Sequence, residues 1–183
     1  MWKIFPSTLI VLMLVSCAPA LKQEYLERGD TNVSFQAFLG SPDSFKGRLY
    51  ILGGLIAETS PTAEGSLVEA LYIPVDSDGH LMNSKGIDGR FLALLPKGKG
   101  ALDPKVYSER RAITIAGEFT GLKPGRIDEM EYIYPVFEIK DIRLWKEIPL
   151  SSLYAPYPEA GPYTGPSLLR DPFWKDRQKP AWR

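Results

Sequence analysis

The stretch from residue 48 to residue 145 most constrains the fold, because short apolar runs alternate there with turn-forming residues. The runs are rich in Ile, Leu, Val, Tyr and Phe, and each is bounded by Gly, Pro or Asp, which is typical of strands and not of long helices. Five strands are therefore predicted, over residues 49–57, 66–75, 89–95, 112–120 and 131–139, the last continuing towards Trp145.

The first of these runs, residues 49–57, is apolar at almost every position. A strand of this kind is buried on both faces, so we expect it at the centre of the domain. Gly53 and Gly54 lie inside it, and adjacent glycines in a strand indicate a bend, a bulge or a close backbone approach, as at the corner of a small barrel.

Two short helices are expected beside the strands. Phe35, Phe38 and Leu39 are spaced as on one helix face, which predicts a helix over Ser34–Leu39. Asp103 is a good N-cap and Pro104 a good first helical residue, which predicts one short helix over Asp103–Ser108, between the third and fourth strands.

Five strands with a short helix between the third and fourth match an oligonucleotide/oligosaccharide-binding (OB) barrel. We therefore predict a mainly β protein built on a small five-stranded OB-like barrel. Another small barrel, or an open sandwich, would also fit the strand spacing.

The N-terminus reads as an export signal that ends at a cysteine. An apolar run over Ile4–Val15 follows Lys3 and is too short to span a bilayer comfortably. Leu14-Val15-Ser16-Cys17 has the order of a bacterial lipobox, in which the chain is cut before Cys17 and that cysteine is acylated. Ala18, rather than Asp, favours onward transport, so we expect a lipid anchor on Cys17 at the periplasmic face of the outer membrane. A plain signal peptide is the alternative.

Composition divides the chain into four parts. Prolines and aromatic residues alternate after residue 148, which predicts an extended, disordered tail with a basic end. The expected parts are a signal peptide over 1–16, a lipidated tether with a short helix over 17–46, the barrel over 47–148 and the tail over 149–183.

The charge and the composition of the chain limit the classes of partner that it can bind. The 22 basic residues balance the 22 acidic ones, which argues against nucleic acid as a partner, because phosphate backbones require concentrated positive charge. His80 is the single histidine and Cys17 the single cysteine, so we expect neither a metal nor a cofactor. The expected partners are the membrane, through the lipid on Cys17, and another envelope protein or a glycan.

A candidate ligand site follows from the predicted fold. OB barrels bind through the face of strands two and three and through the loops after strands one and four. These loops are expected at Ser60–Gly65 and Leu122–Met130. The candidate ligand-binding residues are Arg126, Glu129, Tyr132 and Tyr134. Aromatic faces beside mixed charges suit a neutral polar ligand; the alternative is that the two tyrosines pack within the barrel or against the N-terminal segment.

No nucleophile with a supporting base is evident, so we expect a non-enzymatic binding or structural module. The alternative is a carboxylate-dependent hydrolase of envelope polymers using residues such as Glu129 and Glu131, because paired carboxylates can cleave glycosides at a suitable separation.

From about Pro42 to Trp145 the chain resembles the starvation-inducible outer-membrane lipoproteins of the Slp family. The resemblance implies an outer-membrane lipoprotein linked to starvation or envelope stress, with no catalytic residues to transfer. The matching pieces are Gly53-Gly54 with Ile56, residues 67–69 leading to 74–76, 89–92, 102–104 with Tyr107, Gly117, Gly121, 125–127, 132–136 and 142–145.

The anchor can be tested directly. Replacing Cys17→Ala should abolish incorporation of labelled palmitate and leave an uncleaved or misplaced precursor, because the replacement removes the sulfur that would carry the lipid. Labelling at the wild-type level would exclude Cys17 as the acylated residue.

Overall fold

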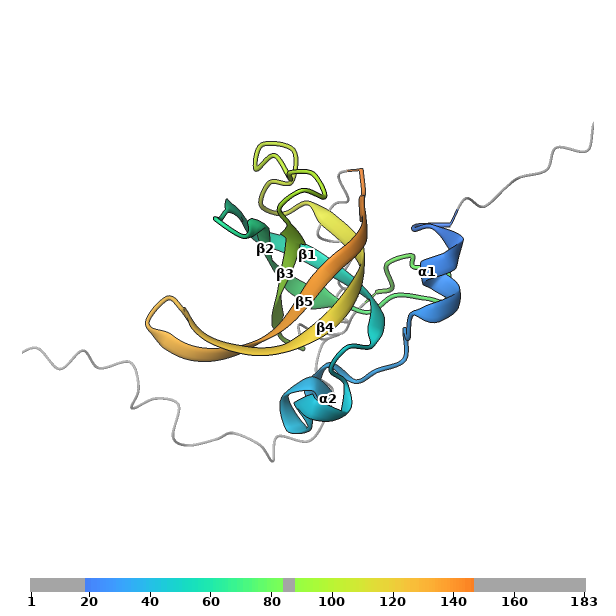
Figure 1. Cartoon of the computed structure of the whole chain (residues 1–183), viewed down its shortest axis with the longest axis horizontal. Helices are drawn as coiled ribbons and strands as arrows, with labels where there is room; N and C mark the ends of the chain where they lie inside the picture. The colour runs from blue at the N-terminus through green and yellow to red at the C-terminus, as the bar shows by residue number, and fades with distance from the viewer. Residues whose placement is uncertain (1–18, 84–87, 147–183) are drawn as a thin grey trace, which may run out of the picture.

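The predicted runs all form strands in the computed structural model, which describes residues 19–83 and 88–146 (Figure 1). The helices come first in the chain and the five strands follow. The elements are α1 (Gln23–Arg28), α2 (Phe35–Gly40), the 3-10 turn η1 (Pro42–Ser44), β1 (Leu49–Pro61), β2 (Gly65–Ile73), β3 (Arg90–Pro96), β4 (Ala112–Ile127) and β5 (Met130–Leu144).

The five strands close into a barrel in the order β1-β2-β3-β5-β4, with β4 paired back to β1. Neighbouring strands are antiparallel, except that β3 and β5 run parallel through Leu92–Leu94 and Val136–Glu138. A closed sheet has no free edge along its paired length. The closure confirms the predicted five-stranded barrel and excludes the open sandwich.

The barrel interior is filled by large side chains. Phe91, Phe119 and Phe137 are fully buried, each from a different strand. Phe38 of α2 joins them, with its ring centroid 4.9 Å from that of Tyr50, 5.1 Å from Phe119 and 5.2 Å from Phe137. The helix predicted near residues 34–39 is therefore present, and it closes one end of the barrel.

The segment predicted as one short helical turn, Asp103–Ser108, forms a single turn and no longer helix. The amides of Val106 and Tyr107 donate to the Asp103 carbonyl at 2.9 and 2.8 Å, and the Asp103 carboxylate accepts from the Lys105 amide at 2.8 Å. The capping role assigned to Asp103 is thus correct, but the helix does not propagate. The first helical turn fixes several dihedral angles for one hydrogen bond, so a segment too short to add further bonds does not form a stable helix.

β1 is buried from Tyr50 to Ile56, as its two-sided apolar pattern predicted. The paired glycines make this possible. A Cβ on Gly54 would lie 2.9 Å from the Ala70 Cβ inside the barrel, and a Cβ on Gly53 would lie 2.5 Å from Leu81 Cδ2 on the other face. The expected close backbone approach is therefore observed on both faces of the strand.

The outer face of β1 is covered by the N-terminal segment. Ala20 and Leu21 are each only 5% exposed and form a second apolar cluster with Ile51 and Val75. The Ala20 amide also donates to the Asp78 carbonyl at 3.1 Å. The segment predicted to be a tether is thus packed on the barrel from Ala20 onwards, because Ile51 offers it an apolar surface.

β4 and β5 continue as a long hairpin beyond the barrel (Figure 1). The loop predicted over Leu122–Met130 is shorter than expected, since Pro124 pairs with Ile133 and the chain reverses at Asp128-Glu129. Asp128 has φ of 52°, a left-handed conformation that Asp tolerates well. This part of β4 pairs only with β5 among the described strands and is therefore an edge strand. Proline is tolerated on an edge strand, where its missing N–H faces away from the partner.

The role of α2 gives a stability prediction. Replacing Phe38→Ala should lower the free energy of unfolding by about 3–5 kcal/mol, because it leaves a cavity among the aromatic rings of the core. Val106→Ala, at a side chain that is 48% exposed, is the control and should change it by less than about 0.5 kcal/mol. Urea unfolding of the mature chain measures both values, and equal effects would contradict the closing role of α2.

Candidate functional site

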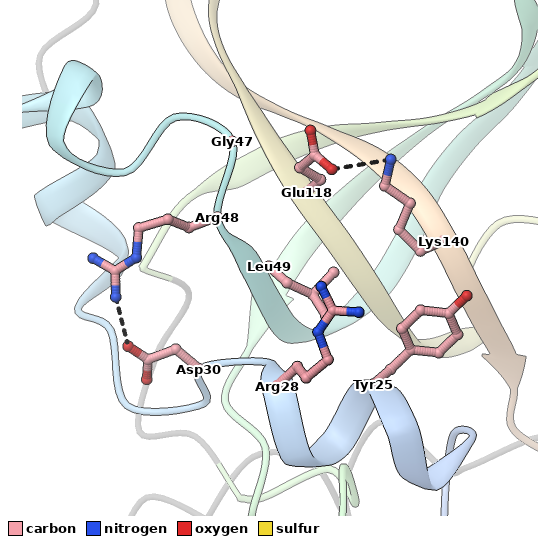
Figure 2. A pocket seen from close by; sticks show the side chains of 8 residues that line it. All are labelled: Tyr25, Arg28, Asp30, Gly47, Arg48, Leu49, Glu118 and Lys140. Carbon is pink, nitrogen blue, oxygen red and sulfur yellow. Dashed lines mark ion pairs between the residues drawn. The ribbon is translucent and has the colours of Figure 1, made fainter.

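A pocket of about 400 Å³ lies where α1 meets the barrel. It is called here the α1 pocket, and its walls come from α1, from the chain leading into β1, and from β4 and β5 (Figure 2). Its lining residues are Tyr25, Arg28, Asp30, Gly47, Arg48, Leu49, Glu118 and Lys140.

Backbone pairing fixes the side of the pocket formed by residues 29–30. The Asp30 amide donates to the Leu49 carbonyl, and the Asp30 carbonyl accepts from the Ile51 amide, both at 3.0 Å. Gly29 permits this approach, because a Cβ there would lie 2.5 Å from Ile51 Cδ1 and 2.9 Å from the Tyr25 carbonyl oxygen. The α1 pocket is thus a product of the docking of the N-terminal segment.

The charges that line the α1 pocket are mostly paired. Lys140 Nζ lies 3.1 Å from Glu118 and 2.8 Å from Glu138. The hydrogen bond to Glu138 raises the pKa of Lys140 above its ordinary value, and the same hydrogen bond lowers the pKa of Glu138. Both groups therefore remain charged at neutral pH.

The other side of the α1 pocket holds a looser pair, Arg48 with Asp30, at 3.8 Å. Arg28 makes no ion pair within residues 19–83 and 88–146. Figure 2 shows its side chain rising from α1 between the Arg48–Asp30 pair and the Glu118–Lys140 pair. The α1 pocket therefore presents one uncompensated guanidinium.

The α1 pocket is not predicted by the sequence, in which residues 22–28 have the composition of a tether. The available signal was the apolar pair Ala20-Leu21 followed by Tyr25-Leu26, all of which pack on or beside the outer face of β1. An apolar pair repeated at that spacing before a two-sided apolar strand indicates docking.

The residues proposed from the sequence all lie on the β4–β5 hairpin. Arg126 and Glu129 are brought together near the tip, where Arg126 Nη2 donates to the Glu129 carbonyl at 3.0 Å. The expected loop Leu122–Met130 is instead mostly strand, because β4 runs to Ile127. Glu129 and Glu131, the carboxylates considered for hydrolysis, are both exposed on the hairpin.

Tyr132 and Tyr134 face β2 and β3. Tyr134 is 3% exposed, and its hydroxyl donates to the Arg126 carbonyl at 3.1 Å. The Tyr132 hydroxyl accepts from the Arg90 amide at 2.8 Å. Their rings pack edge to face with centroids 4.6 Å apart. The buried Tyr134 offers no open ring face, which matches the alternative that these tyrosines pack within the fold.

A charged pair supports these tyrosines. Arg90 on β3 and Glu69 on β2 form an ion pair at 2.6 Å, and both side chains are less than one-third exposed. Burial raises the pKa of Tyr134 above its ordinary value, and the nearby Glu69 carboxylate raises that pKa further. This cluster ties the base of the hairpin to the barrel.

His80 and the acidic residues do not gather into a metal site. His80 Nδ1 lies 3.5 Å from the Asp76 carboxylate, and its ring lies beside Trp145. Within the described ranges no three His, Cys, Asp or Glu side chains could share a metal ion. The helices of this part of the chain are too short or too polar to cross a membrane.

A small closed barrel whose docked segment begins three residues after a lipobox cysteine has the form of a lipid-anchored envelope domain. The chain belongs to the outer membrane lipoprotein Slp family, which matches residues 14–182. The resemblance found in the sequence is thereby confirmed, as are the class of outer-membrane lipoprotein and the location.

Two curated relatives support the assignment. An uncharacterized protein of Haemophilus influenzae is 33% identical over 99 residues, which cover 51% of this chain and 50% of the relative. Outer membrane protein Slp of Escherichia coli is 28% identical over 116 residues, which cover 63% of this chain and 60% of the relative. The chain thus matches between half and three fifths of the length of these relatives. No solved structure matches it.

The buried tyrosines predict a pH dependence. Desolvation raises the pKa of Tyr50, Tyr72 and Tyr134 above the ordinary value of 10.0. Above that pH the unfolded chain loses tyrosine protons that the folded chain keeps, so the free energy of unfolding should fall as pH rises.

Urea unfolding of the wild type and of Tyr134→Phe at several values from about pH 9 to pH 11 tests this dependence. The wild type should lose more stability over that interval than the variant, which lacks one of the three tyrosine hydroxyls whose pKa is raised. Parallel curves would contradict the assignment for Tyr134.

Proposed function

We propose that the protein is a non-enzymatic binding or structural module, held at the periplasmic face of the outer membrane by lipid on Cys17. The observation that carries the proposal is the docking of Ala20 and Leu21 on the barrel. From the family resemblance we further propose a role in the envelope during starvation or stress.

Docking close to the anchor limits how far the barrel can move from the membrane. Cys17 precedes Ala20 by three residues, which span at most about 11 Å when fully extended. Two or more acyl chains make such an anchor stable. The corner of the barrel formed by Ala20 and Asp78 therefore stays beside the bilayer.

The binding surface is proposed at the opposite side. Figure 1 shows the tip of the β4–β5 hairpin on the far side of the barrel from α1. The tip carries Arg126 and Glu129 together with the exposed apolar residues Met130 and Ile133, which are 65% and 45% exposed. Mixed charge beside exposed apolar area suits another envelope protein or a glycan. Tyr132 and Tyr134 support this surface from beneath.

The orientation can be measured in vesicles. If Cys17 is acylated, its sulfur is blocked, so a cysteine introduced elsewhere is the single free thiol. The mature lipoproteins Ser77→Cys and Met130→Cys, each carrying a fluorophore, are placed in vesicles that contain lipids with a quencher on the headgroup. Quenching at residue 77 should exceed that at residue 130 several-fold, since Ser77 precedes the docking residue Asp78.

The quenching experiment can contradict the orientation and the anchor separately. Equal quenching at both positions would contradict a fixed orientation. Labelling of two thiols per chain would show instead that Cys17 carries no lipid, and would contradict the anchor.

A further inference from the structure

We propose that the α1 pocket binds a phosphate ester, with Arg28 as the principal ligand-binding residue. The proposal concerns a site distinct from the hairpin surface, and it begins from the charges that line the pocket. Three cations, Arg28, Arg48 and Lys140, face two carboxylates, Asp30 and Glu118.

The carboxylates are already neutralised by neighbours. Glu118 is held by Lys140, and Lys140 also contacts Glu138, which Lys99 contacts at 3.3 Å. These four side chains form a balanced set of two positive and two negative charges. Asp30 is held by Arg48. Arg28 is an exposed residue and is the charge of the lining that has no ion pair among the described residues, so an anionic group is the ligand that complements the pocket.

The chemistry of the lining favours phosphate over other anions. A guanidinium presents a planar fork of donors that matches phosphate oxygens, and Arg48 and Lys140 line the same pocket with further donors. A phosphate monoester has three terminal oxygens to share among such donors, and in a phosphodiester the two terminal oxygens and the two ester oxygens surround phosphorus tetrahedrally, whereas a carboxylate has two oxygens in one plane. The donor set is therefore best used by a tetrahedral anion.

The size of the α1 pocket indicates an ester and not a bare ion. About 400 Å³ lies within the range of small-molecule sites and exceeds what one phosphate group fills. Tyr25 and Leu49 line the same space and give it an apolar part. The carbon atoms of a glycerol substituent would lie beside Tyr25 and Leu49 while the phosphate meets Arg28.

The ester has two possible sources, a phospholipid headgroup or a soluble phosphate ester. α1 has six residues, about 9 Å of helix, and it separates Arg28 from the residues nearest the anchor. A headgroup is therefore within reach of the pocket, and this source, unlike the site itself, rests on the anchoring proposed above.

The test follows the Nε–Hε NMR signal of Arg28 in the full mature lipoprotein. In an uncharged detergent free of phosphate, glycerol 3-phosphate is added at constant ionic strength. The signal should shift and saturate. Binding measured by calorimetry should weaken about tenfold or more in Arg28→Gln, because a charged hydrogen-bonding group is lost. Arg110→Gln, an exposed arginine outside the lining residues, should bind as the wild type does.

The lipid arm repeats the measurement in phospholipid bicelles. A signal already shifted before any ester is added identifies the headgroup as the source, whereas a shift only after addition identifies a soluble ester. Either result supports the site.

Three results would overturn the phosphate site. These are the absence of a shift in both settings, an equal response to acetate at the same ionic strength, and binding by Arg28→Gln as tight as the wild type. Melting temperatures of both variants near that of the wild type confirm that the fold is retained.

Discussion

The burial of β1 on both of its faces is the constraint on which the rest of the structure depends. Its inner side chains, such as Tyr50 and Ile56, help to fill the barrel, and its outer side chain Ile51 holds the N-terminal segment. Because one strand is buried on both faces, it joins the barrel to the N-terminal segment that begins at Ala20. The α1 pocket follows from that junction.

Local pattern was sufficient to predict the strands and the closed barrel. Each strand has its own apolar run or its own alternation of apolar and polar residues. The adjacent glycines Gly53 and Gly54 indicate the tight packing around β1. The predictions that fail are those that depend on contacts with other strands. The loop expected at Leu122–Met130 rests on residue type alone, whereas the pairing of β4 with β5 places the reversal at Asp128-Glu129.

The candidate sites also show that contacts between residues close in sequence can be predicted, whereas contacts between distant residues cannot. Arg126 and Glu129 are close in sequence, and the structure brings them together as neighbours in one turn. The orientation of Tyr134 depends on Glu69, which lies 65 residues earlier, so the sequence could not decide between a ligand face and a packed ring. The α1 pocket joins residues from Tyr25 to Lys140, and no local motif spans such a set.

The β4–β5 hairpin also has a consequence for self-association. Beyond the barrel, β4 pairs only with β5 among the described strands, so each strand of the hairpin has one edge with unpaired backbone groups. Such edges invite pairing with a second copy of the chain and growth into aggregates. Pro124 interrupts the donors of one edge and Pro135 those of the other, while Lys123 adds charge beside Pro124. Copies of a lipoprotein on one membrane surface are crowded into two dimensions, and a hairpin edge interrupted by proline offers such neighbours fewer backbone donors.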